Sequence, residues 1–195
     1  MKILGISGSL REGSYNTSLL GAAARLLPKD VQFELWGGLK EVPPYDEDDD
    51  TGEAPAAVAT LRETIAGADA VLFATPEYNS SLPGQLKNAI DWVSRPLRTN
   101  PLRNKPVAVV GASTGAFGAV GSQAELRKVL GATGARVVEG DVAVGHAPTR
   151  FDDDGWLVDE NLLEQLEEVV AVLVAAAAVR CEASDSHLAS AGLTA

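Results

Sequence analysis

Apolar runs alternate with amphipathic stretches along the whole chain. Five runs rich in apolar residues predict strands, at Lys2–Ser7, Val31–Trp36, Ala70–Thr75, Val107–Ala112 and Arg136–Val144. Five segments with apolar residues at helical spacing predict helices, at Asn16–Leu27, Ala56–Ala66, Gly84–Ser94, Gly121–Leu130 and Glu160–Val179. Strands that are apolar throughout are typical of a parallel sheet covered on both faces by helices. We therefore expect a doubly wound α/β domain of three layers.

Two segments look less regular than the rest. Pro43–Pro55 contains the acidic run Asp46–Asp50 and predicts an exposed loop. Residues 181–195 are mostly small and polar and predict a mobile C-terminal tail. The folded domain is therefore expected to span residues 1–180.

Composition and charge narrow the classes of function. The 195 residues carry a formal net charge of −11, whereas nucleic-acid and membrane-surface binding need a basic face. A single cysteine, Cys181, excludes a disulfide framework and a zinc knuckle. The first residues are too briefly apolar for a signal peptide, and the longest apolar run is about half a membrane span. We expect a cytoplasmic protein with no metal and no nucleic-acid or membrane partner.

The loop after the first predicted strand has the composition of a phosphate site. A guanidinium, two hydroxyls and an amide stand directly before a helix N-terminus, at Ser9, Arg11, Ser14 and Asn16. Helix N-termini and arginine forks both bind phosphate oxygens. The glycine spacing is that of ATP- and GTP-binding loops, but their lysine is missing, which favours a single terminal phosphate. The alternative is an ordinary turn in which Asn16 caps the helix.

The loop after the third predicted strand has the composition of a flat-ring site. Two prolines stiffen it, and its polar side chains leave the carboxyl end of a buried strand, where ligands bind in doubly wound sheets. Such a loop can bond the edge of a heterocycle, with Tyr78 against the ring. The alternative is a surface turn before the next helix.

Together these loops resemble a known family. The motifs Gly8-Ser9-Leu10-Arg11-x-x-Ser14-x-Asn16 and Pro76-Glu77-Tyr78-Asn79-x-x-x-Pro83-Gly84-x-Leu86-Lys87-Asn88-Ala89-Ile90-Asp91-Trp92 are similar to those of the NADPH-dependent FMN reductase family. That family includes bacterial quinone and chromate reductases and azoreductase-like enzymes. The resemblance covers roughly Met1 to Leu173. It implies a flavodoxin-like fold, with a five-stranded parallel sheet of order 2-1-3-4-5 and FMN at the switch point between the first and third strands.

The resemblance also implies which residues contact the cofactor. The phosphate would be held by the first loop, with two further residues nearby: Ser9, Arg11, Ser14, Asn16, Thr17 and Ser18. The ribityl chain and ring would lie along the second loop: Pro76, Glu77, Tyr78 and Asn79. A third flavin-binding loop would follow the fourth strand: Ser113, Thr114, Gly115 and Gly118.

The activity implied by the resemblance is hydride transfer from NADPH or NADH to FMN, followed by electron transfer to a quinone, free flavin or similar small acceptor. The flavin carries this chemistry, so we name no catalytic side chain. The family also implies a homodimer or tetramer, with the Pro43–Asp46 stretch near a neighbouring subunit. On the predicted helix after the third strand, Leu86, Trp92 and Val93 would either build that interface or pack on the sheet.

Two other functions are compatible with parts of the sequence. A flavodoxin-type electron carrier would share the fold and the cofactor. A serine hydrolase would use Ser113 in Gly111-x-Ser113-x-Gly115 as its nucleophile, with Asp141 and His146 or Asp185 and His187 as partners. The glycines after Ser113 argue against the hydrolase, because they delay the helix that must start directly after such a serine.

Overall fold

The computed structural model describes the backbone of residues 1–191 and the side chains of residues 1–182. The sheet is parallel, with strands in the order β2-β1-β3-β4-β5 and with β6 also paired to β4. Its strands are β1 (Lys2–Ser7), β2 (Gln32–Trp36), β3 (Ala70–Thr75), β4 (Pro106–Ala112), β5 (Arg136–Val137) and β6 (Ala143–Val144). Every residue of β3 and β4 is buried, as their apolar sequences require. The predicted strand order and flavodoxin-like fold are confirmed.

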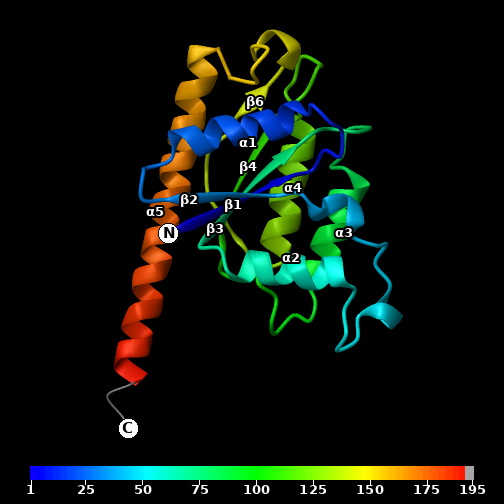
Figure 1. Ribbon diagram of the computed structural model, residues 1–195, viewed down its shortest axis with the longest axis vertical. Helices are drawn as coiled ribbons and strands as arrows, with labels where there is room; N and C mark the ends of the chain where they lie inside the picture. Colours follow the sequence, from blue (N-terminus) through cyan, green and yellow to red (C-terminus); the bar gives the residue numbers. More distant parts are fainter. Residues whose placement is uncertain (192–195) are drawn as a thin grey trace.

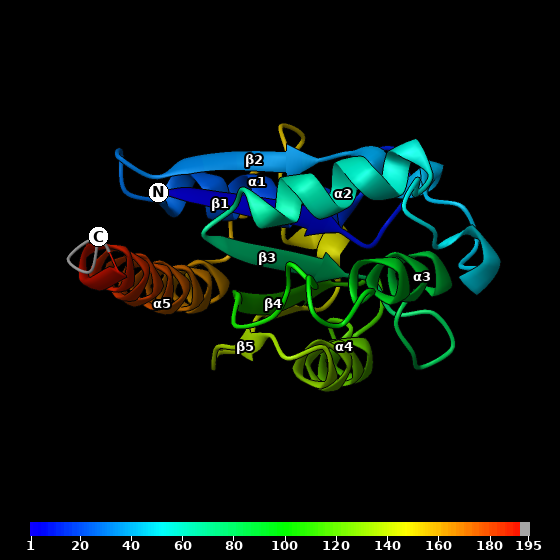
Figure 2. The same cartoon turned by 90° about the horizontal axis from the view of Figure 1, so that it is seen from below.

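The described residues form five α-helices. These helices cover the two faces of the sheet, as Figures 1 and 2 show. They are α1 (Tyr15–Leu26), α2 (Ala56–Ala66), α3 (Gly84–Val93), α4 (Val120–Ala132) and α5 (Glu160–Ala191). Helices α1 and α5 pack on one face and α2, α3 and α4 on the other, so the apolar core is divided into two clusters. Short 3-10 helices lie in the connections, at Gly38–Glu41, Glu47–Asp49 and Ala147–Thr149.

The fifth strand is interrupted, so the prediction of one strand over Arg136–Val144 is wrong. Strand β5 pairs with the start of β4 and β6 with its end. Between them, the Arg127 guanidinium of α4 donates to the carbonyl oxygens of Val109 (2.8 Å) and Gly140 (2.9 Å) and pairs with Asp141 at 2.8 Å. The arginine side chain thus satisfies a strand carbonyl at the point where the neighbouring backbone leaves the sheet.

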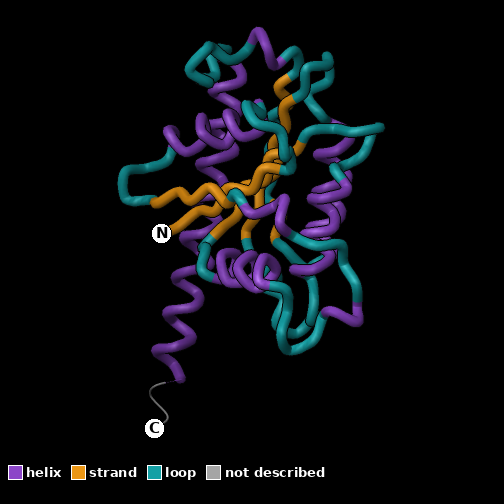
Figure 3. Tube along the Cα trace, turned by 45° about the vertical axis from the view of Figure 1, so that its right-hand side comes forward, coloured by secondary structure: helices purple, strands orange, loops and turns teal. Residues whose placement is uncertain are grey.

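The last helix continues beyond its predicted end at Val179. Helix α5 runs to Ala191 and extends past the sheet (Figures 1 and 3). Neither proline nor glycine occurs between Arg180 and Ala191 to end it. The rest of the predicted tail, at 192–195, lies outside the described residues. Within the described part of the chain, no helix has the length and apolar character needed to cross a membrane.

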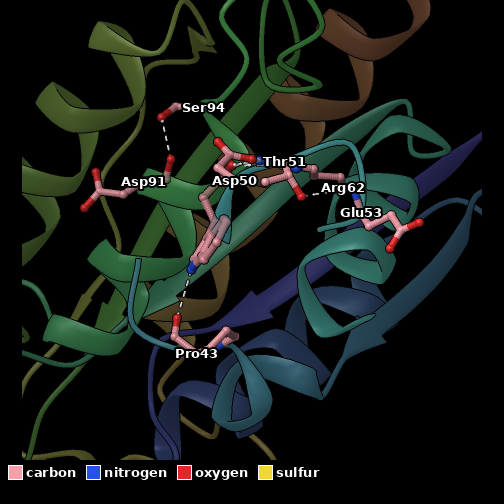
Figure 4. A network of polar contacts seen from close by, with 8 residues as sticks. Pro43, Asp50, Thr51, Glu53, Arg62, Asp91 and Ser94 are labelled. Atoms are coloured by element: carbon pink, nitrogen blue, oxygen red, sulfur yellow. Dashed lines mark hydrogen bonds and ion pairs between the residues drawn. The ribbon is translucent and has the colours of Figure 1, made fainter. Parts of the chain in front are cut away.

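The acidic loop at Pro43–Pro55 is anchored rather than freely exposed. Trp92 Nε1 and Asn88 Nδ2 donate to the Pro43 carbonyl oxygen at 2.9 and 2.7 Å. The other anchor is Arg62, which lies beside Asp50 in Figure 4 and donates to its carboxylate at 2.9 Å. Arg62 also donates to the Trp92 carbonyl oxygen at 2.7 Å. The four acidic residues before Asp50 remain exposed. Pro44 and Thr51–Glu53 are exposed as well, so the expectation of an exposed loop holds for most of the segment, apart from its anchored positions.

The apolar side chains of α3 face the sheet. Leu86, Trp92 and Val93 are all almost completely buried within this one chain. They pack against α2 and the sheet and cannot contribute to an interface between subunits. The packing interpretation of these residues is therefore correct and the interface interpretation is wrong.

Candidate functional site

Three loops meet at the carboxyl ends of β1, β3 and β4. The first is joined to β3 directly, since the Gly8 N–H donates to the Ala74 carbonyl oxygen at 2.8 Å. A Cβ at Gly8 would lie 2.8 Å from the terminal Cδ2 methyl of Leu86, so the absence of a side chain lets the loop pass close to α3. Between the loops lies a groove of about 240 Å³, at the predicted switch point. It is lined by Ser9, Arg11, Ser14, Tyr15, Asn16, Pro76, Glu77, Tyr78, Ala112, Ser113 and Thr114.

The first loop gives one end of the groove a positive character. Ser14 is the N-cap of α1, where its hydroxyl accepts the Asn16 N–H at 3.2 Å, and the first turn of this helix contains no acidic residue. The Arg11 guanidinium lies 5.4 Å from the centre of the Tyr15 ring, which stacks in turn on Phe151 at 5.6 Å. A helix N-terminus and an oriented arginine together favour an anion. The predicted phosphate-binding end therefore has suitable geometry.

Asn16 has partners that the sequence did not indicate. Its Nδ2 donates to the Ala112 carbonyl oxygen at 3.0 Å, and its Oδ1 accepts the Ala112 N–H at 2.9 Å. The side chain is buried between α1 and the end of β4. Although Asn16 lines the groove, its amide is engaged in a buried backbone pair.

Thr17 and Ser18 do not line the groove. The Thr17 hydroxyl donates to Ser7 Oγ at 3.2 Å. Ser18 faces Gly155, where an added Cβ would lie 3.3 Å from its hydroxyl oxygen. Helical rotation turns both positions away from the groove, although they follow Asn16 directly in the sequence.

The second loop contains a tight turn from Tyr78 to Ser81. These two residues exchange backbone hydrogen bonds of 3.0 and 3.1 Å, and both central residues have positive φ, 53° at Asn79 and 62° at Ser80. Positive φ at both centres is typical of a type I′ turn, in which asparagine is well tolerated. Asn79 is thus exposed at the tip and outside the groove lining, whereas Tyr78 stands on the rim.

Two carboxylates hold this loop against α4. Glu77 Oε2 accepts the Ser122 N–H at 3.0 Å, and a Cβ at Gly121 would lie 2.9 Å from the same oxygen. Glu125 Oε2 accepts the Ser81 hydroxyl at 2.6 Å and the Leu82 N–H at 3.2 Å. The hydrogen bond from Ser81, and then that from Leu82, lowers the pKa of Glu125 below its usual value. The loop is therefore rigid on the side of the helix.

The third loop contributes its first residues to the groove. Ser113 and Thr114 line it, whereas Gly115 and Gly118 do not. Gly118 has φ 58° and packs on β6, where an added Cβ would lie 2.3 Å from the Ala143 carbonyl carbon. Its glycine is required by this backbone approach.

The described residues do not form a hydrolase site. The Ser113 hydroxyl accepts the Gly115 N–H at 3.1 Å, and α4 begins only at Val120. Asp141 pairs with Arg127, and His146 is exposed. The side chains of the second candidate pair, Asp185 and His187, lie outside the described residues.

Tyr15 and Ala112 line the groove but were absent from the prediction. Tyr15 lies inside the first motif, and an aromatic residue beside an arginine and a helix start was a usable signal. Ala112 contributes through the position of its backbone, for which its side chain gives no signal.

Comparison with known proteins now identifies the family. A family model described as NADPH-dependent FMN reductase matches residues 1–149. The chain belongs to this family. The predicted resemblance and the oxidoreductase class are thereby confirmed.

Individual members support the same assignment. The chain is 43% identical over 174 residues to an NAD(P)H-dependent FMN reductase of Pseudomonas aeruginosa, a match that covers 89% of this chain and 93% of the relative. It is 36% identical over 169 residues to a quinone reductase of Escherichia coli, covering 85% and 89%. Among solved structures, the flavoenzyme NAD(P)H:acceptor oxidoreductase FerB of Paracoccus denitrificans matches with a TM-score of 0.79 at 34% identity, covering 90% and 96%. This FMN reductase family member therefore resembles its relatives over most of their lengths.

Proposed function

We propose that the protein binds FMN non-covalently in the groove and acts as an NAD(P)H-dependent reductase of a quinone or a similar small acceptor. The observation that carries this proposal is the groove itself, which joins a cationic end rich in hydroxyl groups to rigid loops at the β1/β3 switch point. Bound there, FMN supplies the hydride- and electron-transfer chemistry.

The residues of the first loop fit the phosphate. Arg11 would pair with phosphate oxygens through its planar guanidinium. The hydroxyl groups of Ser9 and Ser14, and the N–H groups of the first turn of α1, would add hydrogen bonds. The site would therefore bind a phosphate through the charge of one guanidinium and through several hydroxyl and backbone N–H donors.

The two other loops fit the remainder of the cofactor. Pro76, Glu77 and Tyr78 would lie along one side, and Ser113 and Thr114 along another. Because Glu77 and Glu125 tie the second loop to α4, the orientation of a bound ring would be set by the backbone. Residues of the groove would therefore orient the cofactor without acting as acid or base.

The phosphate assignment is tested by replacing Arg11. We expect Arg11→Ala to weaken FMN binding by about 1.5–3 kcal/mol, the scale of hydrogen bonds to charged groups. Riboflavin lacks the phosphate, so its affinity should hardly change. Fluorescence titration of both flavins measures the difference, with Arg98→Ala as the matched control because Arg98 is exposed in the loop after α3. Equal losses for FMN and riboflavin would refute the assignment.

A reductase and an electron carrier differ in whether NADPH or NADH rapidly reduces the bound flavin. The FMN-loaded protein should lose its yellow absorbance quickly with NADPH or NADH and regain it when a quinone is added. A flavodoxin-type carrier would bind FMN but would not be reduced rapidly by either nucleotide. Stopped-flow mixing measures both steps, and failure of reduction by both nucleotides would favour the carrier.

We also propose a homodimer in which a second subunit covers the flavin. The groove volume is below the roughly 300–1,000 Å³ typical of pockets that enclose a ligand, so one subunit would leave part of the ring uncovered. Large apolar side chains are exposed on the same loops, with Leu10 48% exposed and Phe117 79% exposed. Burial of such side chains favours a symmetric contact.

Light scattering tests this assembly. We expect a dimer for the wild type and a weaker one for Phe117→Asp, with Val172→Asp on the exposed side of α5 as the control. A wild-type monomer with full FMN occupancy and full reductase activity would refute it.

A further inference from the structure

We infer that Asn16 is a positioning residue, whose carboxamide couples the phosphate loop to the loop after β4. Asn16 exchanges two hydrogen bonds with the backbone of Ala112, a residue 96 positions away in the sequence. Both residues are buried, with exposures of 3% and 2%. This inference rests on the proposed binding of FMN in the groove.

The end of β4 needs a partner at this place. The N–H groups of Gly111 and Ser113 donate to the carbonyl oxygens of Val142 and Val144. Backbone groups alternate in direction along a strand, so the N–H and carbonyl groups of Ala112 point to the opposite side, towards β3. Strand β3 ends at Thr75 and is followed by Pro76, which has no N–H to continue the ladder. The Asn16 carboxamide presents an N–H donor and a carbonyl acceptor side by side, in the spacing of a peptide group, and it supplies one of each to Ala112.

The Asn16–Ala112 pair connects two loops of the groove. Asn16 lies in the first turn of α1, whose N-cap Ser14 belongs to the phosphate loop, and Ala112 is followed by Ser113 and Thr114 of the groove. The pair therefore sets the spacing between the phosphate end and the third loop. If Asn16 were instead a ligand of the phosphate, it would donate the second N–H of its Nδ2, which is not used in the bond to the Ala112 carbonyl oxygen.

The positioning role and the phosphate-ligand role of Asn16 predict different effects on the binding of FMN, which has a phosphate, and of riboflavin, which has none. If Asn16 positions the loops, Asn16→Ala should weaken FMN and riboflavin alike, by about tenfold to a hundredfold, because a buried backbone pair loses its partners. Under the same conditions Arg11→Ala should weaken FMN and spare riboflavin. Dissociation constants of both flavins are measured for the wild type and the two variants.

The outcomes separate this inference from the proposed function. Loss of FMN affinity alone in Asn16→Ala would assign a phosphate ligand and overturn the positioning role, as would no loss for either flavin. Failure of the wild-type protein to bind FMN would instead refute the proposed function.

A second variant decides the matter if Asn16→Ala does not fold. In Asn16→Asp the carboxylate accepts the Ala112 N–H but cannot donate to its carbonyl unless it is protonated. Burial beside a carbonyl oxygen raises the pKa of such a carboxyl. Riboflavin affinity of this variant should therefore approach the wild-type value at acid pH and fall as the carboxyl ionises.

Riboflavin is the probe here because it carries no phosphate for the new charge to repel. The ionisable side chains that share the groove are Arg11, Tyr15, Glu77 and Tyr78, and all four are present in the wild type as well. The wild type is therefore the control for their titration. Identical pH profiles for wild type and Asn16→Asp would overturn the positioning role.

Discussion

Lys105 is a charged residue buried directly before β4, and we expect it to make the free energy of unfolding depend on pH. It precedes β4 and is only 1% exposed. Its Nζ donates to the carbonyl oxygens of Ala66 (3.3 Å) and Ala68, at the C-terminal end of α2. Carbonyl groups at a helix C-terminus have no partner within the helix, so the ammonium both caps the helix and meets its negative end.

The environment of the ammonium lowers its pKa. Burial is the main cause and the positive charge of Arg180 the second, whereas Asp69 and Cys181 act in the opposite direction. The result is a pKa of about 8 for Lys105 in place of its ordinary value of 10.5. The amine is thus protonated at neutral pH at a cost to the folded state.

The sign and size of the effect follow from linkage. Below about pH 8 both the folded and unfolded chains hold the proton, and stability is at its lowest. Between about pH 8 and pH 10.5 the unfolded chain binds more protons than the folded one, so the free energy of unfolding rises with pH. The full shift of the Lys105 pKa corresponds to about 3 kcal/mol of unfolding free energy. About 2 kcal/mol of this should be gained between pH 7 and pH 9.5.

Urea denaturation of the wild type and Lys105→Met measures this gain. The difference in unfolding free energy between the two proteins removes the contribution of all other titrating groups. We expect the wild type to gain about 2 kcal/mol on the variant between pH 7 and pH 9.5. In the control Lys29→Met, the substituted lysine is exposed, so its difference from the wild type should stay constant. A Lys105→Met difference that is constant or reversed over this range would refute the argument.

Three further outcomes test other parts of the fold and site. Arg127→Met should lower the free energy of unfolding by about 1–3 kcal/mol in urea denaturation, because a buried strand carbonyl loses its donor. Gly118→Ala should destabilise by more than about 1 kcal/mol, since the position has positive φ and no room for a Cβ, whereas Gly131→Ala inside α4 should stabilise slightly. Mass spectrometry after fluorophosphonate treatment should show no adduct on Ser113, and Ser113→Ala should keep most reductase activity.

The pattern of apolar residues along the sequence was enough to predict the first four strands and the fold class. Ala70–Thr75 and Val107–Ala112 are short runs that are apolar at every position or nearly so, which is typical of a strand buried on both faces. The two loop motifs were also local, and they predicted the place of the groove and most of its lining. Each strand and each motif can be recognised from one continuous stretch of the sequence.

Tertiary structure decided what the polar side chains of these motifs do. Asn16 sits in a phosphate-type motif, yet its amide bonds Ala112, and the Glu77 carboxylate caps α4. Arg127 replaces a strand partner in the interrupted fifth strand. A side-chain amide, carboxylate or guanidinium can satisfy a ligand or a backbone group equally well. The choice depends on which backbone groups the packed sheet leaves without a partner, and that is settled only when segments distant in the sequence meet.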